Sequence, residues 1–203
     1  ILIVFLLNCS QSHALGLVNG EAGLTYWVTD VDELDSTSLE APPVGGFGEL
    51  WLNQKLGIRA SLYRLKEENV IMASDEQITV DLKYRLASLT NNTFLAAGVG
   101  WEQDRFGSEG SVSGSRIVVE GRVGFLGIVR IFGEAGWTPD MGHIGLRQDI
   151  SAIGVEAGLV LDPLPFVSLR TSWRYHITDF TGAITGTSSR EASYGVVMGV
   201  DIH

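Results

Sequence analysis

Residues 165–178, PFVSLRTSWRYHIT, separate into two chemically different rows when every second residue is taken. One row is mostly apolar or aromatic: Val167, Leu169, Thr171, Trp173, Tyr175 and Ile177. The other row carries hydroxyl and cationic groups: Ser168, Arg170, Ser172, Arg174, His176 and Thr178. Successive side chains of a strand point to opposite faces, so this stretch predicts a strand with one apolar and one polar face. It exceeds the roughly 5–6 residues usual in globular proteins and suits a bilayer-crossing strand, which needs about 9–11.

The same alternation recurs at residues 77–86, 116–125 and 193–202. In a water-soluble sandwich or a ligand-carrying barrel, the apolar row would face a dry core and the polar row would face water. In an outer-membrane barrel, the apolar row faces lipid and the polar row faces the lumen. Both architectures produce this alternation, so the choice between them depends on other features of the chain. Burial of Leu82, Val119, Leu169 and Val200 by other parts of the chain would contradict the membrane reading.

The first residues are typical of a secretion signal. Residues 1–7, ILIVFLL, are apolar, and Ser12-His13-Ala14 fits a small-x-small cleavage site. We therefore predict a partial signal peptide at 1–14 and a single domain at 15–203. The only cysteine, Cys9, lies in the signal segment, so we expect neither a disulfide framework nor a cysteine-based metal site.

Composition narrows the class of protein. The chain is 45% hydrophobic, with 25 glycines and 5 prolines, yet no apolar run reaches the roughly 18 residues of a membrane helix. A secreted chain without helical spans can cross a membrane only as a closed barrel, because lipid cannot satisfy open backbone groups. The net charge of −10 argues against nucleic acid as a partner.

We predict ten strands, at 19–30, 46–53, 55–65, 76–87, 92–103, 115–126, 128–138, 147–161, 164–178 and 189–203. Short connections alternate with long ones, and the long ones are expected at 31–45, 66–75, 104–114, 139–146 and 179–188. An even number of strands with short turns at one end and long loops at the other is typical of bacterial outer-membrane barrels. The predicted fold is therefore all-β: a ten-stranded antiparallel transmembrane up-and-down barrel with short periplasmic turns and long extracellular loops, in the outer membrane of a Gram-negative bacterium.

Aromatic residues near the predicted strand ends are candidates for the girdles at the two membrane interfaces. They are Tyr26, Trp27, Trp51, Trp101, Trp137, Trp173 and Tyr175.

The C-terminal third resembles a known family. Residues 130–140, RIFGEAGWTPD, look like the strand-and-loop signature of YfaZ-type outer-membrane proteins. Residues 165–175 are similar to that family's penultimate strand, and the closing YGVVMGVDIH occupies the place of its final strand. The resemblance implies a small, porin-like outer-membrane barrel with no established chemistry. His203 departs from the terminal aromatic residue that the barrel-assembly machinery normally recognises.

The inward-facing row carries charges of both signs on neighbouring strands, which predicts a lumen-lining charged network. Its predicted members are Asp81, Lys83, Arg85, Glu120, Arg122, Arg130, Glu134, Arg170, Arg174 and His176. The same inward-facing row holds Glu21, Arg59, Glu102, Arg116 and Glu156. A ten-stranded lumen lies between the filled interior of eight strands and the open channel of 16–18. Two functions therefore stay open: passage of ions or small polar solutes, and a structural barrel with a sealed lumen.

His176 and Thr178 suggest a third function. The pair has a loose likeness to the His-x-Ser pair of lipid A deacylases, in which a histidine activates a serine hydroxyl. The alternation turns His176 toward the lumen, whereas an acyl-chain hydrolase needs a site open to lipid. We therefore expect no enzyme, no catalytic residue, no cofactor and no metal site. The expected partners are outer-membrane lipid, the barrel-assembly machinery and, for a channel, ions or small polar solutes.

Overall fold

The computed structural model describes residues 18–29, 44–64, 76–107, 109–125 and 127–202. The predicted signal peptide at 1–14 lies outside the described residues. The strands are β1 (Val18–Thr29), β2 (Val44–Leu52), β3 (Leu56–Arg64), β4 (Glu76–Thr90), β5 (Thr93–Phe106), β6 (Gly110–Phe125), β7 (Val129–Thr138), β8 (Arg147–Leu164), β9 (Val167–Gly182) and β10 (Ser188–Ile202). Among the described residues, the structure has no helix with the length and hydropathy of a membrane span.

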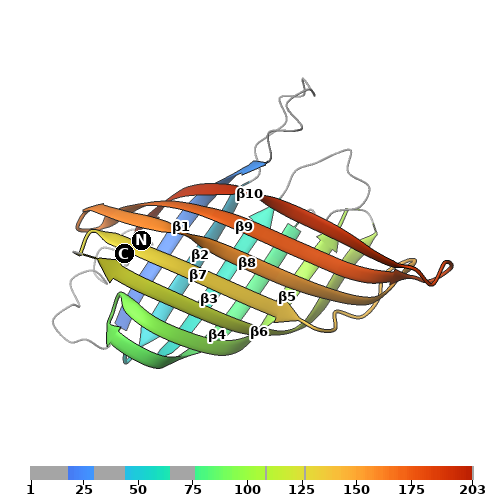
Figure 1. The fold of residues 1–203 in the computed structure, drawn as a ribbon, viewed down its shortest axis with the longest axis horizontal. Coiled ribbons are helices and arrows are strands. Elements are labelled where there is room, and N and C mark those ends of the chain that lie inside the picture. The colour runs from blue at the N-terminus through green and yellow to red at the C-terminus, as the bar shows by residue number, and fades with distance from the viewer. Residues whose placement is uncertain (1–17, 30–43, 65–75, 108, 126, 203) are drawn as a thin grey trace, which may run out of the picture.

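The strands form one closed antiparallel ring (Figure 1). Each strand pairs with its neighbours in sequence, and β1 also pairs with β10, which closes the barrel. The strand register places apolar residues opposite apolar residues. Leu169 of β9, for example, lies opposite Leu161 of β8 and Val200 of β10. Opposite residues of paired strands point to the same face, so the apolar rows join into one continuous surface. The predicted ten-stranded up-and-down barrel is confirmed.

The apolar surface is on the outside of the barrel. Leu82, Val119, Leu169 and Val200 are 46%, 45%, 50% and 49% exposed, so no other part of the described chain covers them. A soluble sandwich would bury these side chains, and burial stabilises by roughly 25 cal/mol for each Å² of apolar surface. The outer surface therefore faces hydrocarbon, and the sandwich is excluded.

The two ends of the barrel differ in their connections. Short turns at 53–55, 91–92, 126–128 and 165–166 define what we call the turn end. In the first turn, the Lys55 amide donates to the Leu52 carbonyl, and the two residues between them, Asn53 and Gln54, have φ of 50° and 56°. Positive φ at both central residues matches the twist of the flanking strands. The opposite end, here the loop end, carries the described connections at 139–146 and 183–187, and β1, β3 and β5 also end there. In the outer membrane the turn end faces the periplasm.

Two of the predicted long loops are wrong. Residues 104–114 are mostly strand, because β5 continues to Phe106 and β6 begins at Gly110. Residues 179–188 likewise belong largely to the β9–β10 hairpin, which reaches furthest at the loop end in Figure 1. The ends of these strands carry polar side chains, so a search for alternating apolar residues did not detect them as strand. The predicted loops 31–45 and 66–75 fall mainly on residues outside the described part of the chain.

Most described girdle candidates lie on the outer surface. Trp101, Trp137 and Trp173 are exposed by 39%, 48% and 48%. Trp51 is a wrong prediction, because its ring points into the barrel and is only 3% exposed. There it lies against Phe94, with ring centroids 5.1 Å apart. The side chain of Trp27 lies outside the described part.

Candidate functional site in the barrel lumen

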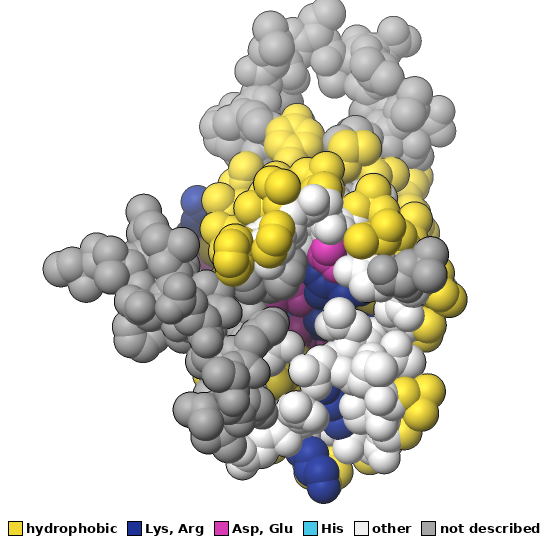
Figure 2. All heavy atoms as spheres, turned by 90° about the vertical axis from the view of Figure 1, so that its left-hand side faces the viewer, with side chains coloured by type: hydrophobic (Ala, Val, Ile, Leu, Met, Phe, Trp, Pro, Cys, Tyr) yellow, Lys and Arg dark blue, Asp and Glu magenta, His cyan; other side chains and the backbone are white. Residues whose placement is uncertain are grey.

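The inner face of the barrel is charged along most of its length, because the polar rows of the strands point inward. Figure 2, a view onto the turn end, shows Lys, Arg, Asp and Glu side chains near the centre, with hydrophobic side chains gathered above them. The structure places all the predicted lumen residues on this face, Glu134 half-buried and the others buried. They are Asp81, Lys83, Arg85, Glu120, Arg122, Arg130, Glu134, Arg170, Arg174 and His176.

Near the turn end, Glu21 of β1 binds three arginines. Its Oε2 accepts hydrogen bonds from Arg122 Nη1 at 2.8 Å and Arg130 Nη1 at 3.1 Å. Its Oε1 accepts one from Arg170 Nη2 at 3.1 Å. In the ring β1 is bonded to β2 and β10, whereas these arginines belong to β6, β7 and β9. The contacts of Glu21 therefore cross the lumen.

Glu49 of β2 and Glu120 of β6 share two cations at the next level. Lys83 Nζ lies 2.5 Å from Glu49 Oε1 and also pairs with Glu120. Arg122 donates from Nε to Glu120 Oε1 at 2.5 Å and from Nη2 to Glu49. All four side chains are less than a tenth exposed. Each charge therefore depends on its partners, because an isolated buried charge is very costly.

Near the middle of the barrel, Glu134 of β7 contacts three cationic side chains. Its carboxylate lies 3.5 Å from Arg59 Nη1, 3.3 Å from Arg116 Nη2 and 3.6 Å from Lys83 Nζ. A β-carbon at Gly136 would lie 2.2 Å from Cζ of Arg116. Glycine at that position therefore leaves the space that the guanidinium group occupies.

Aromatic rings fill space between the charged groups. The guanidinium carbon of Arg170 lies 4.4 Å from the ring centroids of both Phe47 and Phe132. The guanidinium carbon of Arg174 lies 3.8 Å from the ring of Tyr63. A guanidinium group within about 6 Å of a ring centroid is attracted to the ring face. These stacks occupy cross-section of the lumen that ion pairs alone would leave empty.

A further layer lies toward the loop end. Arg174 donates to Glu156 Oε2 at 3.2 Å and to Gln77 of β4, on a strand that is not its neighbour. Tyr63 of β3 donates its hydroxyl to the same Glu156 oxygen at 3.1 Å. His176 Nε2 lies 3.1 Å from Glu102 Oε1 across the lumen.

The hydrolase pair is not assembled. His176 and Thr178 are both buried in the lumen, but no hydrogen bond between these two described residues is present. The ring nitrogen of His176 instead faces Glu102 and, at 3.5 Å, Asp104. A histidine that activates a hydroxyl must lie within hydrogen-bond reach of it.

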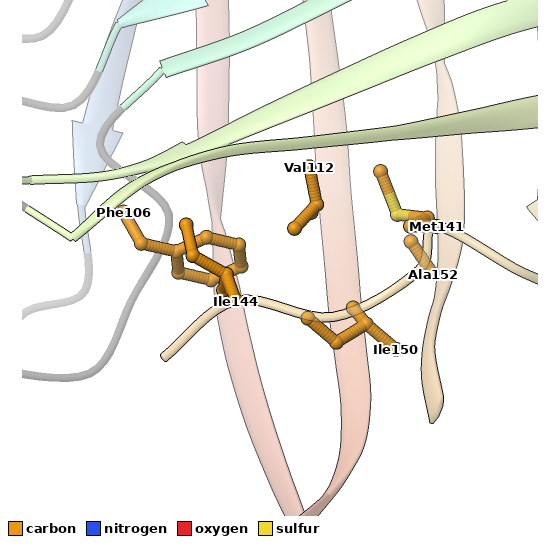
Figure 3. Packing of buried hydrophobic residues seen from close by; sticks show 6 residues of the cluster. All are labelled: Phe106, Val112, Met141, Ile144, Ile150 and Ala152. Atoms are coloured by element: carbon orange, nitrogen blue, oxygen red, sulfur yellow. The ribbon is translucent and has the colours of Figure 1, made fainter. Parts of the chain in front are cut away.

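Beyond the charged layers, the loop end holds an apolar cluster (Figure 3). Its buried members are Phe106, Val112, Met141, Ile144, Ile150 and Ala152, and Phe180 packs against it. Met141 and Ile144 come from the connection at 139–146, which is held to β8 by hydrogen bonds between the backbones of Met141 and Ile150 and of Ile150 and Gly142. This connection therefore packs over part of the lumen.

Sequence reasoning missed three carboxylates of the lumen: Glu49, Asp104 and Asp201. Asp104 lies beyond the predicted end of its strand, although it continues the inward phase of Glu102. Asp201 accepts a hydrogen bond from Arg170 at 2.8 Å. Counting two residues forward from Glu102 would have found Asp104. Glu49 lies on the same face of β2 as Trp51, which was predicted to lie in a girdle, so its inward position was not evident from the sequence.

The chain has the fold of bacterial outer-membrane barrels. The crystal structure of the outer membrane protease OmpT from Escherichia coli is similar, with a TM-score of 0.55 and 10% identity over 92% of this chain and 93% of that chain. Weaker matches include the outer membrane channel DcaP of Acinetobacter baumannii (TM-score 0.31, 9% identity, 91% and 96% covered) and neisserial surface protein A (0.29, 13%, 92% and 96%). No protein-family model and no curated protein sequence matches the chain.

The physical features and the fold agree on location. A closed ring, an apolar outer surface and a charged interior are the features of an outer-membrane barrel. The protein is therefore an outer-membrane β-barrel.

Proposed function

We propose that this protein is a structural outer-membrane barrel whose lumen is sealed by its own side chains and does not conduct ions. The observation that carries the proposal is the series of cross-lumen contacts at successive heights. They run from Glu21 near the turn end, through Glu49 and Glu134, to Glu102 near the loop end.

An ion that entered this lumen would have to separate paired charges. Arg122 alone contacts Glu21, Glu49 and Glu120, so displacing it would take a cationic partner from three buried carboxylates at once. Removing one partner of a buried pair costs about 3–5 kcal/mol, because the remaining charge has no compensation. A sealed lumen therefore fits the geometry better than a water-filled path.

Electrical measurement tests the proposal. Full-length protein is refolded into lipid vesicles, its folding is checked by heat-modifiable gel migration, and its incorporation is checked by flotation of the vesicles. In planar bilayers formed from these vesicles with KCl on both sides, we expect the current to stay at the baseline of protein-free lipid. Stable unitary current steps from folded wild-type protein would overturn the proposal and favour the channel function.

The proposal includes that the barrel is not a lipid hydrolase. The support is the orientation of His176, whose ring nitrogen contacts Glu102 and Asp104 rather than a hydroxyl. With acylated lipid A as the substrate, we expect no fatty-acid release above that of protein-free vesicles, from the wild type or from His176→Ala. Release by the wild type that His176→Ala abolishes would restore the hydrolase function.

Two finer assignments belong to the same proposal. Membership of the YfaZ-type family rests on residues 130–140, 165–175 and 194–203, and a solved YfaZ-type structure should show ten strands with the counterparts of Arg130 and Arg170 inside the barrel. A YfaZ-type barrel with a different strand number would contradict it. The partners are then outer-membrane lipid and, during insertion, the barrel-assembly machinery.

A further inference from the structure

One group of lumen side chains contains a carboxylate, Asp104, that accepts no hydrogen bond from the described residues and contacts no arginine or lysine among them. Asp81 also accepts no hydrogen bond, but Arg116 Nε lies 3.3 Å from it. Glu102 and Asp104 lie two residues apart on the inner face of β5, and His176 lies on β9. These strands are not neighbours in the ring, so barrel closure brings together residues 74 positions apart in sequence. All three side chains are buried.

Asp104 is the unusual member of the group. Its side chain is fully buried, yet neither carboxylate oxygen accepts a hydrogen bond from any described residue. Its ion-pair contact is with His176 Nε2, 3.5 Å from Oδ2. Burying a carboxylate without donors is very costly unless a cation compensates it. A cation bound directly to this carboxylate would therefore stabilise it.

The neighbouring arginines are already committed to other carboxylates. Arg116 is shared among Asp81, Glu102 and Glu134, at 3.3, 3.4 and 3.3 Å. Arg174 pairs with Glu156 at 3.2 Å. Neither arginine is in ion-pair contact with Asp104 in the described part, so Glu102 and Asp104 both face the same His176 nitrogen.

The spacing of the three groups matches metal coordination. Nε2 of His176 lies 3.1 Å from Glu102 Oε1 and 3.5 Å from Asp104 Oδ2, and the candidate ligand atoms all lie within 4.8 Å of one another. Four ligands at about 2.0–2.1 Å around a tetrahedral Zn²⁺ are separated by roughly 3.3 Å. A small inward movement of Asp104 would therefore complete three corners of a tetrahedron.

We propose that His176, Glu102 and Asp104 form a binding site for a divalent transition-metal ion of the Zn²⁺ class, with a fourth position left for water. The imidazole ligand favours zinc and its neighbours in the series, whereas Mg²⁺ and Ca²⁺ prefer sites made of oxygen atoms alone. The site departs from the sequence-based prediction of no metal, because only the closed barrel brings the three residues together.

The surroundings support the same assignment. Thr138 and Gln77 both donate hydrogen bonds to Glu102, which fixes the orientation of that carboxylate. Outer-shell hydrogen bonds of this kind orient metal ligands, and their loss typically weakens metal binding about 10–100-fold. Phe106, the next inward-facing residue of β5 after Asp104, belongs to the apolar cluster, so the site lies between that cluster and the charged lumen.

Metal titration tests the proposal. Full-length protein without a histidine tag is refolded in detergent, treated with EDTA and titrated with Zn²⁺ by calorimetry, with Co²⁺ as a spectroscopic probe. We expect one Zn²⁺ per chain and the visible absorption of tetrahedral Co²⁺, which Zn²⁺ displaces. We expect Asp104→Asn and His176→Gln each to weaken binding more than tenfold, and Thr138→Val to weaken it about tenfold or more.

His143 provides the matched control, because it is an exposed histidine in the connection at 139–146. His143→Ala should bind Zn²⁺ like the wild type, and heat-modifiable migration checks that each variant is folded. Asp104→Asn preserves the shape of the side chain, so it separates loss of a ligand from loss of the fold. Three results would overturn the proposal: no binding by folded wild type, binding unchanged in both Asp104→Asn and His176→Gln, or tighter binding of Mg²⁺ or Ca²⁺ than of Zn²⁺.

Discussion

The barrel has two regions that differ in which face of the wall is apolar: the membrane-spanning region and the loop end. In the membrane-spanning region, Val119 of β6 faces outward and is 45% exposed, whereas the adjacent Glu120 is buried in the lumen. Nearer the loop end, the same strand turns exposed Ser111 and Ser113 outward and buried Val112 inward. The outer surface thus changes from apolar to polar along one continuous strand, and the interior changes in the opposite direction.

The difference shows that the surrounding medium decides which face is apolar. Where the wall meets hydrocarbon, apolar groups face outward and charged groups pair in the lumen. Where the strands project beyond the bilayer, the outer wall meets water, and Phe106 and Ile150 form a small core inside. The lengths agree: β8 has 18 residues and β9 has 16, more than the roughly 9–11 that a bilayer requires.

The largest expected effect tests the charged interior of the membrane-spanning region. Arg122→Met removes the cation that Glu21, Glu49 and Glu120 share. We expect the free energy of unfolding in lipid vesicles, measured by guanidinium titration, to fall by about 3–5 kcal/mol, because buried carboxylates lose their partner.

Arg190 is the matched control for that substitution. It pairs with Asp179 at 2.7 Å on the exposed surface, at the loop end of the β9–β10 hairpin. Arg190→Met should leave the unfolding midpoint unchanged, because water and salt screen such a pair. Equal losses of stability in the two variants would show that the lumen charges are solvated. The proposed difference between buried lumen charges and exposed surface charges would then be wrong.

The second prediction tests the outer wall on a single strand. Val119→Arg places a charge on the surface that faces hydrocarbon, and we expect it to lower the free energy of unfolding by about 2–4 kcal/mol. Ser113→Arg, six positions nearer the loop end, should have an effect close to zero, because that face meets water. The same guanidinium titration measures both, and a large loss for Ser113→Arg would move the bilayer boundary beyond β6.

The reversal explains which parts of the fold were predictable from sequence. Alternating rows identified all ten strands, because the lipid-facing rows are consistently apolar. The stretch at 104–114 was predicted as a loop, because Ser111 and Ser113 face outward and leave no apolar row to detect. The alternation of the strand continues there, but the apolar residue, Val112, faces inward and the serines face outward. A search for apolar residues on the lipid-facing side misses this pattern.

The candidate sites were predictable only in part. Alternation placed the side chains of Arg122 and His176 inside the barrel, but it carries no information on which strand faces which across the lumen. That pairing depends on strand tilt and on the closure of β1 with β10. The contact between Glu102 and His176 therefore appears only in the closed ring.

The smallest expected effect tests the apolar interior of the loop end. Ile150→Val removes one methylene group from a fully buried side chain, and we expect it to lower the free energy of unfolding by about 0.5–1.5 kcal/mol. Ile184→Val removes the same group from a side chain that is 81% exposed in the connection at 183–187, so it should be neutral. Hydrogen exchange of the Met141 amide, which donates to Ile150, should accelerate in Ile150→Val alone. Unchanged exchange and stability would mean that the cluster in Figure 3 contributes no packing energy, and the polarity reversal would then be confined to the outer wall.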